Sequence, residues 1–523
     1  MEVNPILLEV FKNRFSSIAE EMGAILQRTG FSANIKERKD FSCAVFDGNG
    51  DMIAQAAHIP VHLGSMPMSV KSAIQSLPME EGDMVILNDP YKGGTHLPDI
   101  TVIAPVFIDK EEPSFYVANR AHHADVGGIS PGSMPLSNSI FQEGINIPPI
   151  KLVKRGKIDT EILSFIKNNV RTPDEREGDF KAQISANLTG IKRLKELCAK
   201  YGIEKVSFYG KELLAYSEKV MRRIIRDIPD GIYEGEDFIE DDGLGNKDIK
   251  INVLIHINED QCILDFSKSD KQVEGSLNAV YSITASSVYY VFRSLAEKEI
   301  PTNAGCFRPI KIKTKKGTIV DAVFPAPVSA GNVETSQRIV DVVLKALSKA
   351  VPDKVPAASQ GTMNNITVGG VNPETGEYFT YYETIGGGTG ATAYSDGESG
   401  IQSHMTNTLN TPVEALEFQY PIMVTKYKIR KNSGGEGLNR GGDGIIREYL
   451  FLTDVEVNII SERRKIPPYG LFGGEPGETG QNIHITAEGE KILPGKVSVK
   501  VKKGERIRIE TPGGGGYGSI EKV

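Results

Sequence analysis

Histidine and aspartate residues gather in the first quarter of the chain at spacings that suit a metal ion. His96 precedes Asp99 by three residues, and the run from His122 to Asp125 contains two histidines and one aspartate. The whole chain of 523 residues has only eight histidines, so this concentration is uneven. Imidazole nitrogens and carboxylate oxygens are ligands of catalytic metal sites that keep one coordination position open. We therefore expect a divalent transition metal here: zinc, manganese or iron.

A β-hairpin would bring these two groups together. The apolar stretch at residues 100–118 is interrupted by a charged turn, which predicts two antiparallel strands. If the strands pair about the middle of that turn, Asp99 lies opposite His122 and His96 lies opposite Asp125. One end of the hairpin would then carry two imidazoles and two carboxylates.

The spacing alone leaves the third ligand open. Side chains alternate along a strand, so His123 and Asp125 would share one face while His122 points to the other. A histidine beside a carboxylate is also a common structural hydrogen-bond pair, and we prefer that interpretation for His58 and His62. Three more histidines stand alone and are expected to be structural or solvent-facing: His256, His404 and His484.

The elements expected around the hairpin are helices and short strands in mixed order. A helix starts at the capping pair Asn4-Pro5 and keeps helical spacing until Gly30. Residues 159–226 are mainly helical, strands dominate from about residue 231, and the section after residue 433 alternates short strands with Gly/Pro turns. Further elements are a hairpin at 42–54, strands at 85–87, 249–257 and 261–266, and helices at 284–295 and 338–350.

This order of elements predicts an α+β, multidomain protein with mixed sheets, helices and a β-rich C-terminal domain. A chain of 523 residues is too long for one ordinary core. We divide it into an N-terminal metal-binding catalytic domain (1–230), a central α+β domain (231–432) and a C-terminal β-rich domain (433–523).

Composition narrows the classes of protein. The 60 basic and 68 acidic residues give a formal net charge of -8, and no long basic run occurs, which argues against a nucleic-acid partner. No apolar stretch approaches the length of a membrane span, and charged residues interrupt the N-terminal apolar run, which is untypical of a signal peptide. The cysteines are widely separated, which fits reduced thiols in a cytoplasmic protein: Cys43, Cys198, Cys262 and Cys306.

The 54 glycines form clusters, of which Gly386 to Gly388 and Gly513 to Gly516 are the longest. Such clusters are typical of turns and of places where the backbone passes close to another group. No cluster has the GxxxxGK[ST] spacing of a phosphate loop, and none has the strand-then-helix context of a dinucleotide fingerprint. We therefore expect this chain to have no ATP site of its own.

Several longer segments resemble the hydantoinase B/oxoprolinase family, and the match extends over nearly the full chain. The segments that carry the resemblance are residues 37–44, 57–66, 88–99, 119–131, 332–338, 404–408, 433–437 and 511–513.

The resemblance implies a subunit or half of an ATP-dependent hydantoinase or 5-oxoprolinase, or the alpha subunit of a ketone carboxylase. A hydantoinase A-type partner with an actin/hexokinase-like fold would use ATP and Mg to phosphorylate the carbonyl or enol oxygen of the substrate. The B-type chain would hold the metal and complete the reaction within a hetero-oligomer. The metal triad of the carboxylase branch matches His96, Asp99 and His122. The carboxylases do not keep the second histidine of the pair, so His123 favours the hydrolase branch and a small cyclic amide as substrate; a non-catalytic scaffold is the third alternative.

Two further sets of residues receive expected roles. His123 and Asp125 are candidates for taking a proton from water beside the metal. Glu37, Arg38 and Asp40 are candidates for binding substrate, since arginine can hold a carboxylate by two hydrogen bonds; a surface charge cluster is the alternative. A third set either contacts a phosphate or caps a helix: Thr335, Ser336 and Arg338.

Overall fold

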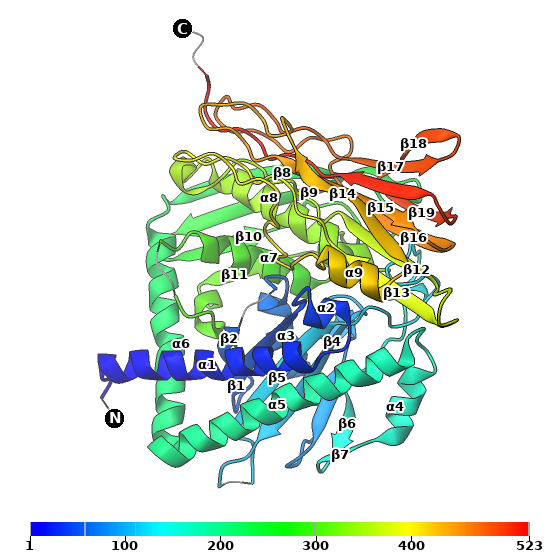
Figure 1. Ribbon diagram of the computed structural model, residues 1–523. Coiled ribbons are helices and arrows are strands. Elements are labelled where there is room, and N and C mark those ends of the chain that lie inside the picture. Colours follow the sequence, from blue (N-terminus) through cyan, green and yellow to red (C-terminus); the bar gives the residue numbers. More distant parts are fainter. Residues whose placement is uncertain (1, 57–58, 110, 298–299, 521–523) are drawn as a thin grey trace.

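The computed structural model describes residues 2–56, 59–109, 111–297 and 300–520. In the view of Figure 1 the N-terminal sheet, in blue and cyan, lies below the central sheet, in green, and below the two C-terminal sheets, in yellow to red. The central sheet contains a parallel strand pair beside antiparallel ones. The predicted α+β fold with mixed sheets is confirmed.

The N-terminal sheet has seven strands in the order β2-β1-β5-β4-β3-β6-β7. Both of its faces are buried, because alternate residues of its strands join different apolar clusters. Val102 packs with residues of α1 and α5, whereas Ile103 packs with residues of α3. The strands are β1 (Phe41–Asp47), β2 (Met52–Ala56), β3 (Met84–Leu87), β4 (Asp99–Val106), β5 (Phe115–His122), β6 (Ile150–Lys154) and β7 (Lys157–Ile158).

The hairpin of β4 and β5 forms as predicted and is buried along its whole length. Asp99 pairs with His122 in the register that the sequence predicted. The second predicted pair, His96 with Asp125, does not form. Strand β4 begins at Asp99 and β5 ends at His122, so His96 and Asp125 lie outside the paired strands.

Helices cover this sheet from both sides. The Asn4 side chain accepts hydrogen bonds from the Ile6 and Leu7 amides, and the helix ends before Gly30, as expected. The predicted helical stretch is confirmed as three helices, of which the second packs along α1. In the described residues no helix is long and apolar enough to cross a bilayer. The helices are α1 (Pro5–Thr29), α2 (Ala33–Lys36), α3 (His62–Ser76), α4 (Thr160–Lys167), α5 (Pro173–Tyr201) and α6 (Ile203–Arg226), with short turns η1 (Pro90–Lys92) and η2 (Ile140–Gln142).

The central sheet has the order β11-β10-β9-β8. Helix α8 packs on β8 and β9, and it also packs on α7, which in turn contacts α3 of the N-terminal part. A single π-helical turn, η4, directly precedes α8. The elements are β8 (Gly231–Asp241), β9 (Lys247–Asn258), β10 (Gln261–Asp265), β11 (Ile310–Lys313), α7 (Tyr281–Ser294), α8 (Ser336–Leu347), η3 (Ala304–Phe307), η4 (Gly331–Thr335) and η5 (Pro352–Lys354).

Two sheets form the C-terminal part, in the orders β13-β12-β16-β19 and β14-β15-β20-β17-β18. Strands before and after residue 432 pair within both sheets, so the predicted domain boundary at this residue falls between hydrogen-bonded strands. The elements are β12 (Asn365–Val371), β13 (Tyr378–Glu383), α9 (Val413–Gln419), β14 (Ile422–Arg430), β15 (Gly444–Phe451), β16 (Val455–Ile460), β17 (Gln481–Thr486), β18 (Gly489–Leu493), β19 (Lys496–Val501) and β20 (Arg506–Glu510).

The glycine clusters lie where backbone segments pack directly on one another. A Cβ atom on Gly441 would lie 2.0 Å from the carbonyl oxygen of Gly514, and one on Gly513 would lie 1.9 Å from that of Ser433. No side chain fits at either position. The prediction of close backbone approach is confirmed for these segments.

Candidate metal centre

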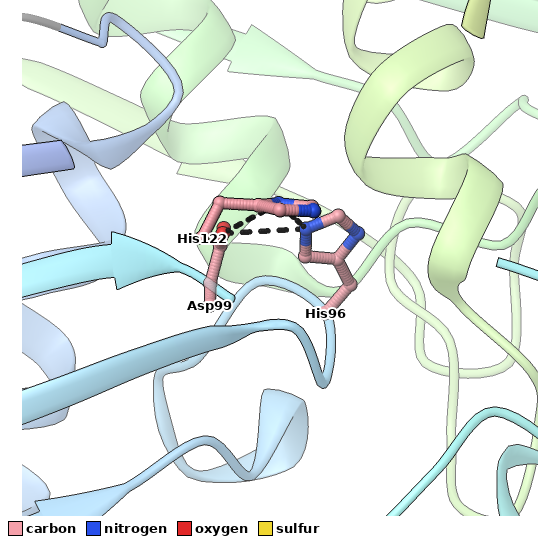
Figure 2. A group of neighbouring side chains, drawn as sticks. All are labelled: His96, Asp99 and His122. Carbon is pink, nitrogen blue, oxygen red and sulfur yellow. Dashed lines mark hydrogen bonds and ion pairs between the residues drawn. The ribbon is translucent and has the colours of Figure 1, made fainter. Parts of the chain in front are cut away.

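Asp99 and His122 face each other at the open end of the β4–β5 hairpin, and His96 reaches the same point from the loop before β4 (Figure 2). The Oδ1 atom of Asp99 lies 3.3 Å from His96 Nε2 and 3.2 Å from His122 Nδ1. The two imidazole nitrogens are 3.2 Å apart. All three side chains are buried. The structure thus brings together the three residues that the sequence assigned to the metal.

Asp99 is held so that one carboxylate oxygen stays available. Its Oδ2 accepts a hydrogen bond from the Thr95 hydroxyl at 2.5 Å and lies 3.4 Å from His62 Nε2. His62 in turn is placed by the Ser42 hydroxyl, 3.0 Å from its Nδ1. His62 therefore belongs to the site by orienting Asp99, whereas His58 lies outside the described residues.

His96 is oriented by a segment more than 200 residues away in the sequence. Its Nδ1 lies 3.2 Å from the carbonyl oxygen of Ser329, which can only accept a hydrogen bond. In the neutral ring Nδ1 therefore carries the hydrogen and Nε2 keeps a lone pair. The carboxamide Nδ2 of Asn332 lies 3.0 Å from that Nε2.

His122 is fixed by stacking. Its ring lies nearly parallel to the ring of Tyr382 on β13, with centroids 4.6 Å apart. Its Nε2 is buried and has no hydrogen-bond partner among the described residues. Such an unpaired buried atom is uncommon in folded proteins and calls for a ligand or water.

Burial and mutual contact shift the pKa values of the cluster. Burial would raise the pKa of Asp99, but His96, His122 and His62 around it hold that pKa well below its usual range. Burial lowers the pKa values of His62 and His122 despite the attraction of Asp99. For His96 burial acts in the same direction, but Asp99 outweighs it and the pKa is raised. The pKa shifts of Asp99, His62 and His122 favour a carboxylate beside neutral imidazoles, which is the protonation state that binds a metal, whereas the raised pKa of His96 opposes it.

The spacing of the three donor atoms fits one metal ion. Ligands about 2.1 Å from an ion, at angles of about 90–110°, lie about 3.0–3.4 Å from one another. The three observed separations are 3.2, 3.2 and 3.3 Å. The donor set of two imidazoles and one carboxylate is typical of zinc, manganese and iron sites.

A small cavity adjoins the cluster. Its volume is about 20 Å³, enough for an ion or a single water. Asp40 enters it from the start of β1, and the backbone carbonyl of Asp40 accepts a hydrogen bond from the His122 amide. Burial raises the pKa of Asp40, while His122 and Arg38 oppose that shift. The remaining lining residues are Ile59, Val61, His62, Asp99, His122, Asn332, Val333, Met363, Tyr382, Thr384, Met405 and Thr406.

Of the three residues predicted to bind substrate, only Asp40 lines this cavity. The Arg38 guanidinium is buried and donates to the Tyr382 carbonyl and to the Thr384 hydroxyl, at 2.9 and 3.1 Å. It also lies over the Tyr382 ring, and so supports the residue that stacks on His122. Glu37 is half-buried at the end of α2.

The structure does not bring His123 and Asp125 to the metal cluster. His123 points to α5, where its Nε2 contacts Gln183 at 3.0 Å and its ring packs on Phe180; its Nδ1 has no partner among the described residues. Asp125 pairs with Arg171 at 2.9 Å. The physical reason is the alternation of a strand: His122 faces Asp99, so its neighbour faces away.

Thr335, Ser336 and Arg338, the third predicted set, are buried and bonded to groups inside the protein. Ser336 donates to the Asn332 carbonyl and Thr335 to the Leu277 carbonyl. Arg338 is buried and pairs with Asp237 and Glu462 at 2.9 and 3.1 Å. These bonds do not correspond to a helix cap or to a phosphate site.

Three residues of the site were missed from the sequence as partners of the metal triad: His62, Asn332 and Tyr382. His62 was taken for a separate structural pair. Asn332 stands in a segment that carries the family resemblance, but it lies 236 residues from His96. No local spacing could have connected them.

The fold agrees with what the chain is similar to. A family model of hydantoinase B/oxoprolinase matches residues 4–520, and the chain belongs to that family. It is 46% identical to the uncharacterized protein MJ0963 of Methanocaldococcus jannaschii, over 99% of this chain and 91% of that protein. It is 32% identical to a protein of Pseudomonas sp. (strain NS671) provisionally named as the B-type component of a D-/L-hydantoinase, over 99% of this chain and 90% of that one.

Some relatives are much longer. The chain is 43% identical to the 5-oxoprolinase of Dictyostelium discoideum, over 100% of this chain but only 41% of that enzyme. The remaining part of the 5-oxoprolinase has no counterpart in these 523 residues.

Two solved structures share the fold. The ATP-dependent caprolactamase of Pseudomonas jessenii superposes with a TM-score of 0.92 at 30% identity, covering 99% of this chain and 92% of that one. A nucleotide-free acetone carboxylase superposes with a TM-score of 0.89, covering 98% of this chain and 76% of that one. At 20% identity the second likeness shows the fold alone.

Proposed function

We propose that this chain holds a divalent metal ion and uses it to open a cyclic amide that a partner has activated with ATP. The observation that carries the proposal is the buried triad His96, Asp99 and His122, whose donor atoms lie 3.2–3.3 Å apart beside a cavity. The names of the relatives support the reaction class, since they are a 5-oxoprolinase, a hydantoinase component and an ATP-dependent caprolactamase.

In this proposal the triad holds the ion through His96 Nε2, Asp99 Oδ1 and His122 Nδ1. When bound, zinc, manganese or iron would polarise the reacting oxygen and make water a better nucleophile near neutral pH. His62 and Thr95 fix Asp99 so that its Oδ1 faces the two imidazoles. Tyr382 keeps the His122 ring in the plane from which Nδ1 meets Asp99.

Asp40 is the base that we assign to this reaction, in place of His123 and Asp125. Its carboxyl lines the cavity beside the triad, whereas the other two side chains are bonded elsewhere. A carboxylate within reach of a water in the cavity can take its proton as the water adds to the activated carbonyl carbon. The C–N bond of the resulting tetrahedral carbon then breaks, and the ring nitrogen leaves as the amine with the proton that Asp40 took. A second water then releases the phosphoryl group of the acyl phosphate as inorganic phosphate, which leaves the ring-opened carboxylate.

The partner in this proposal is a hydantoinase A-type subunit that binds ATP and Mg. An unstrained amide carbonyl is a poor electrophile, and phosphorylation of its oxygen supplies the driving force. One relative is named as one component of a hydantoinase, and the 5-oxoprolinases carry further sequence beyond the part that matches this chain. The chain itself has no phosphate-loop motif. We therefore assign the nucleotide site to the partner.

The alternatives are a carboxylase alpha subunit and a scaffold without catalysis. The acetone carboxylase likeness extends only to the fold, so it does not favour carboxylation. A scaffold has no use for three buried donor atoms at ligand spacing. Cyclic-amide hydrolysis is therefore the function that the site supports best.

The test is turnover by the chain together with its ATP-using partner. We expect ATP consumption and ring-opened product with 5-oxoproline, hydantoin or caprolactam, without bicarbonate. Both are measured in the same reaction, with and without bicarbonate. Turnover that needs bicarbonate and a ketone would replace this proposal with the carboxylase.

A further inference from the structure

Asn332 lies against the triad and its carboxamide is only half satisfied. The side chain is 4% exposed and lines the cavity. Its Nδ2 lies 3.0 Å from His96 Nε2, while its Oδ1 has no hydrogen-bond partner among the described residues. A buried amide oxygen without a partner destabilises the fold, so this atom calls for a ligand.

The backbone that carries Asn332 is fixed in place. Asn332 stands in the π-helical turn η4, a feature that is often found at functional sites. The preceding Gly331 packs so tightly that a Cβ atom would lie 1.9 Å from the carbonyl oxygen of Asn278. The side-chain amide of Asn278 donates to three backbone carbonyls. The carboxamide of Asn332 is therefore the part that can adjust.

A metal ion bound at His96 Nε2 would break the contact of that atom with the Asn332 side chain. Because Ser329 holds the hydrogen on His96 Nδ1, the single lone pair at Nε2 serves either the Asn332 amide or an ion, but not both. An ion would displace the Asn332 N–H and repel it. The last torsion of an asparagine side chain has a broad, two-fold preference, so a half-turn exchanges Nδ2 and Oδ1 without moving the backbone.

We propose that Asn332 is a fourth protein ligand of the metal, through Oδ1. This rests on the metal centre of the proposed function. After the half-turn Oδ1 occupies the place of Nδ2, 3.0 Å from His96 Nε2, which is the spacing of neighbouring ligands on one ion. The amide hydrogens then turn to where Oδ1 stood, and the water that the cavity can hold accepts them.

The ligand would come from a different part of the molecule than the triad. The triad belongs to the end of the N-terminal sheet, whereas Asn332 leads directly into α8 on the central sheet. One ion would thus tie the two parts together. A neutral oxygen ligand also leaves the positive charge of the ion unchanged, so its power to polarise a substrate is preserved.

The experiment is metal binding by the purified full chain, measured by competition with a chelator for Zn²⁺ and by the visible absorption of bound Co²⁺. Asn332→Leu removes the oxygen at similar volume, Asn332→Asp keeps an oxygen ligand, and Thr406→Val changes another polar residue of the same cavity. We expect Asn332→Leu to weaken Zn²⁺ binding at least about 10-fold and to change the Co²⁺ spectrum. Asn332→Asp and Thr406→Val should bind as the unchanged protein does, and circular dichroism checks the fold of each.

Unchanged affinity and spectrum in Asn332→Leu would overturn the proposal, and so would equal losses in Asn332→Leu and Asn332→Asp, which would indicate a hydrogen-bond donor instead. If a variant does not fold, a crystal structure of the unchanged protein with Zn²⁺ decides, with Oδ1 expected within about 2.3 Å of the ion. Retention of metal by His96→Ala and His122→Ala is a separate result: it would refute the metal centre itself.

Discussion

The two sides of the end of strand β5 both carry histidine and aspartate, but the contacts of these residues differ. On one side, His122 meets Asp99 and His96 beside a cavity, with the three donor atoms 3.2–3.3 Å apart. On the other side, Asp125 is saturated: its Oδ1 accepts from the Gly127 and Arg171 amides, and its Oδ2 from the Gly132 amide and the Arg171 guanidinium.

This difference indicates what separates the proposed metal centre from a structural polar network. Both sides contain a buried aspartate close to a histidine in the sequence. What differs is whether several donor atoms converge beside a space that can hold an ion, as they do at the triad but not around the unpaired Nδ1 of His123. A carboxylate that already accepts four hydrogen bonds has no capacity left for a metal. The predictions below test that contrast, from the largest expected effect to the smallest.

The largest effect is expected on the side of the triad. His96→Ala and His122→Ala should each lose the metal and reduce ring opening about a thousandfold or more, because the ion supplies several kcal/mol of transition-state stabilisation. The measurements are elemental analysis of the purified variants and product formation in the complex with the partner. Circular dichroism should show a retained fold. Full metal content in both variants would contradict the assignment.

The next effect tests the base. Asp40→Asn should keep the metal and lower kcat about 100- to 1,000-fold, because the amide cannot take a proton from water. A matched control is Thr406→Val, which changes another polar residue of the cavity without removing a carboxyl. If Asp40→Asn loses its metal together with its activity, Asp40 is a metal ligand and not the base that takes the proton from water.

Much of the local structure was predictable from the sequence. The Asn4 cap, the β4–β5 hairpin and the Asp99–His122 pair follow from spacing and strand geometry, and the structure confirms them. The contributions of Asn332 and Tyr382 were not predictable, because their contacts depend on how distant sheets and turns pack. The direction of His123 was left undecided, since alternation gives opposite faces to neighbours without saying which face is the site.

His123 should affect acid stability rather than metal binding. Burial and the nearby Arg176 lower its pKa from the usual 6.5 to about 4. Between pH 6.5 and about pH 4, His123 is therefore protonated in the unfolded chain and neutral in the folded chain. The free energy of unfolding falls as the pH drops through this window, by roughly 3 kcal/mol from this residue alone.

His123→Gln removes that titration, so its stability should depend less on pH between 6.5 and 4 than that of the unchanged protein. Urea unfolding at several pH values measures the difference. Metal content should stay unchanged, and turnover should fall much less than in Asp40→Asn. A loss of turnover as large as that of Asp40→Asn, with metal retained, would return the role of base to His123.

The smallest effect is expected at Asp125, where the contrast is sharpest. Asp125→Asn keeps one acceptor oxygen but places an NH₂ group against the Gly132 amide and the Arg171 guanidinium, which are both donors. This donor-to-donor contact should lower the free energy of unfolding by about 1–3 kcal/mol. Arg171→Gln is the milder control, since Arg171 is partly exposed and the backbone amides still satisfy the carboxylate. Metal affinity should stay unchanged in both variants, because neither group has a lone pair free for the ion. A tenfold or larger loss of metal affinity in Asp125→Asn, with the fold intact, would mean that the two sides of β5 act as one site.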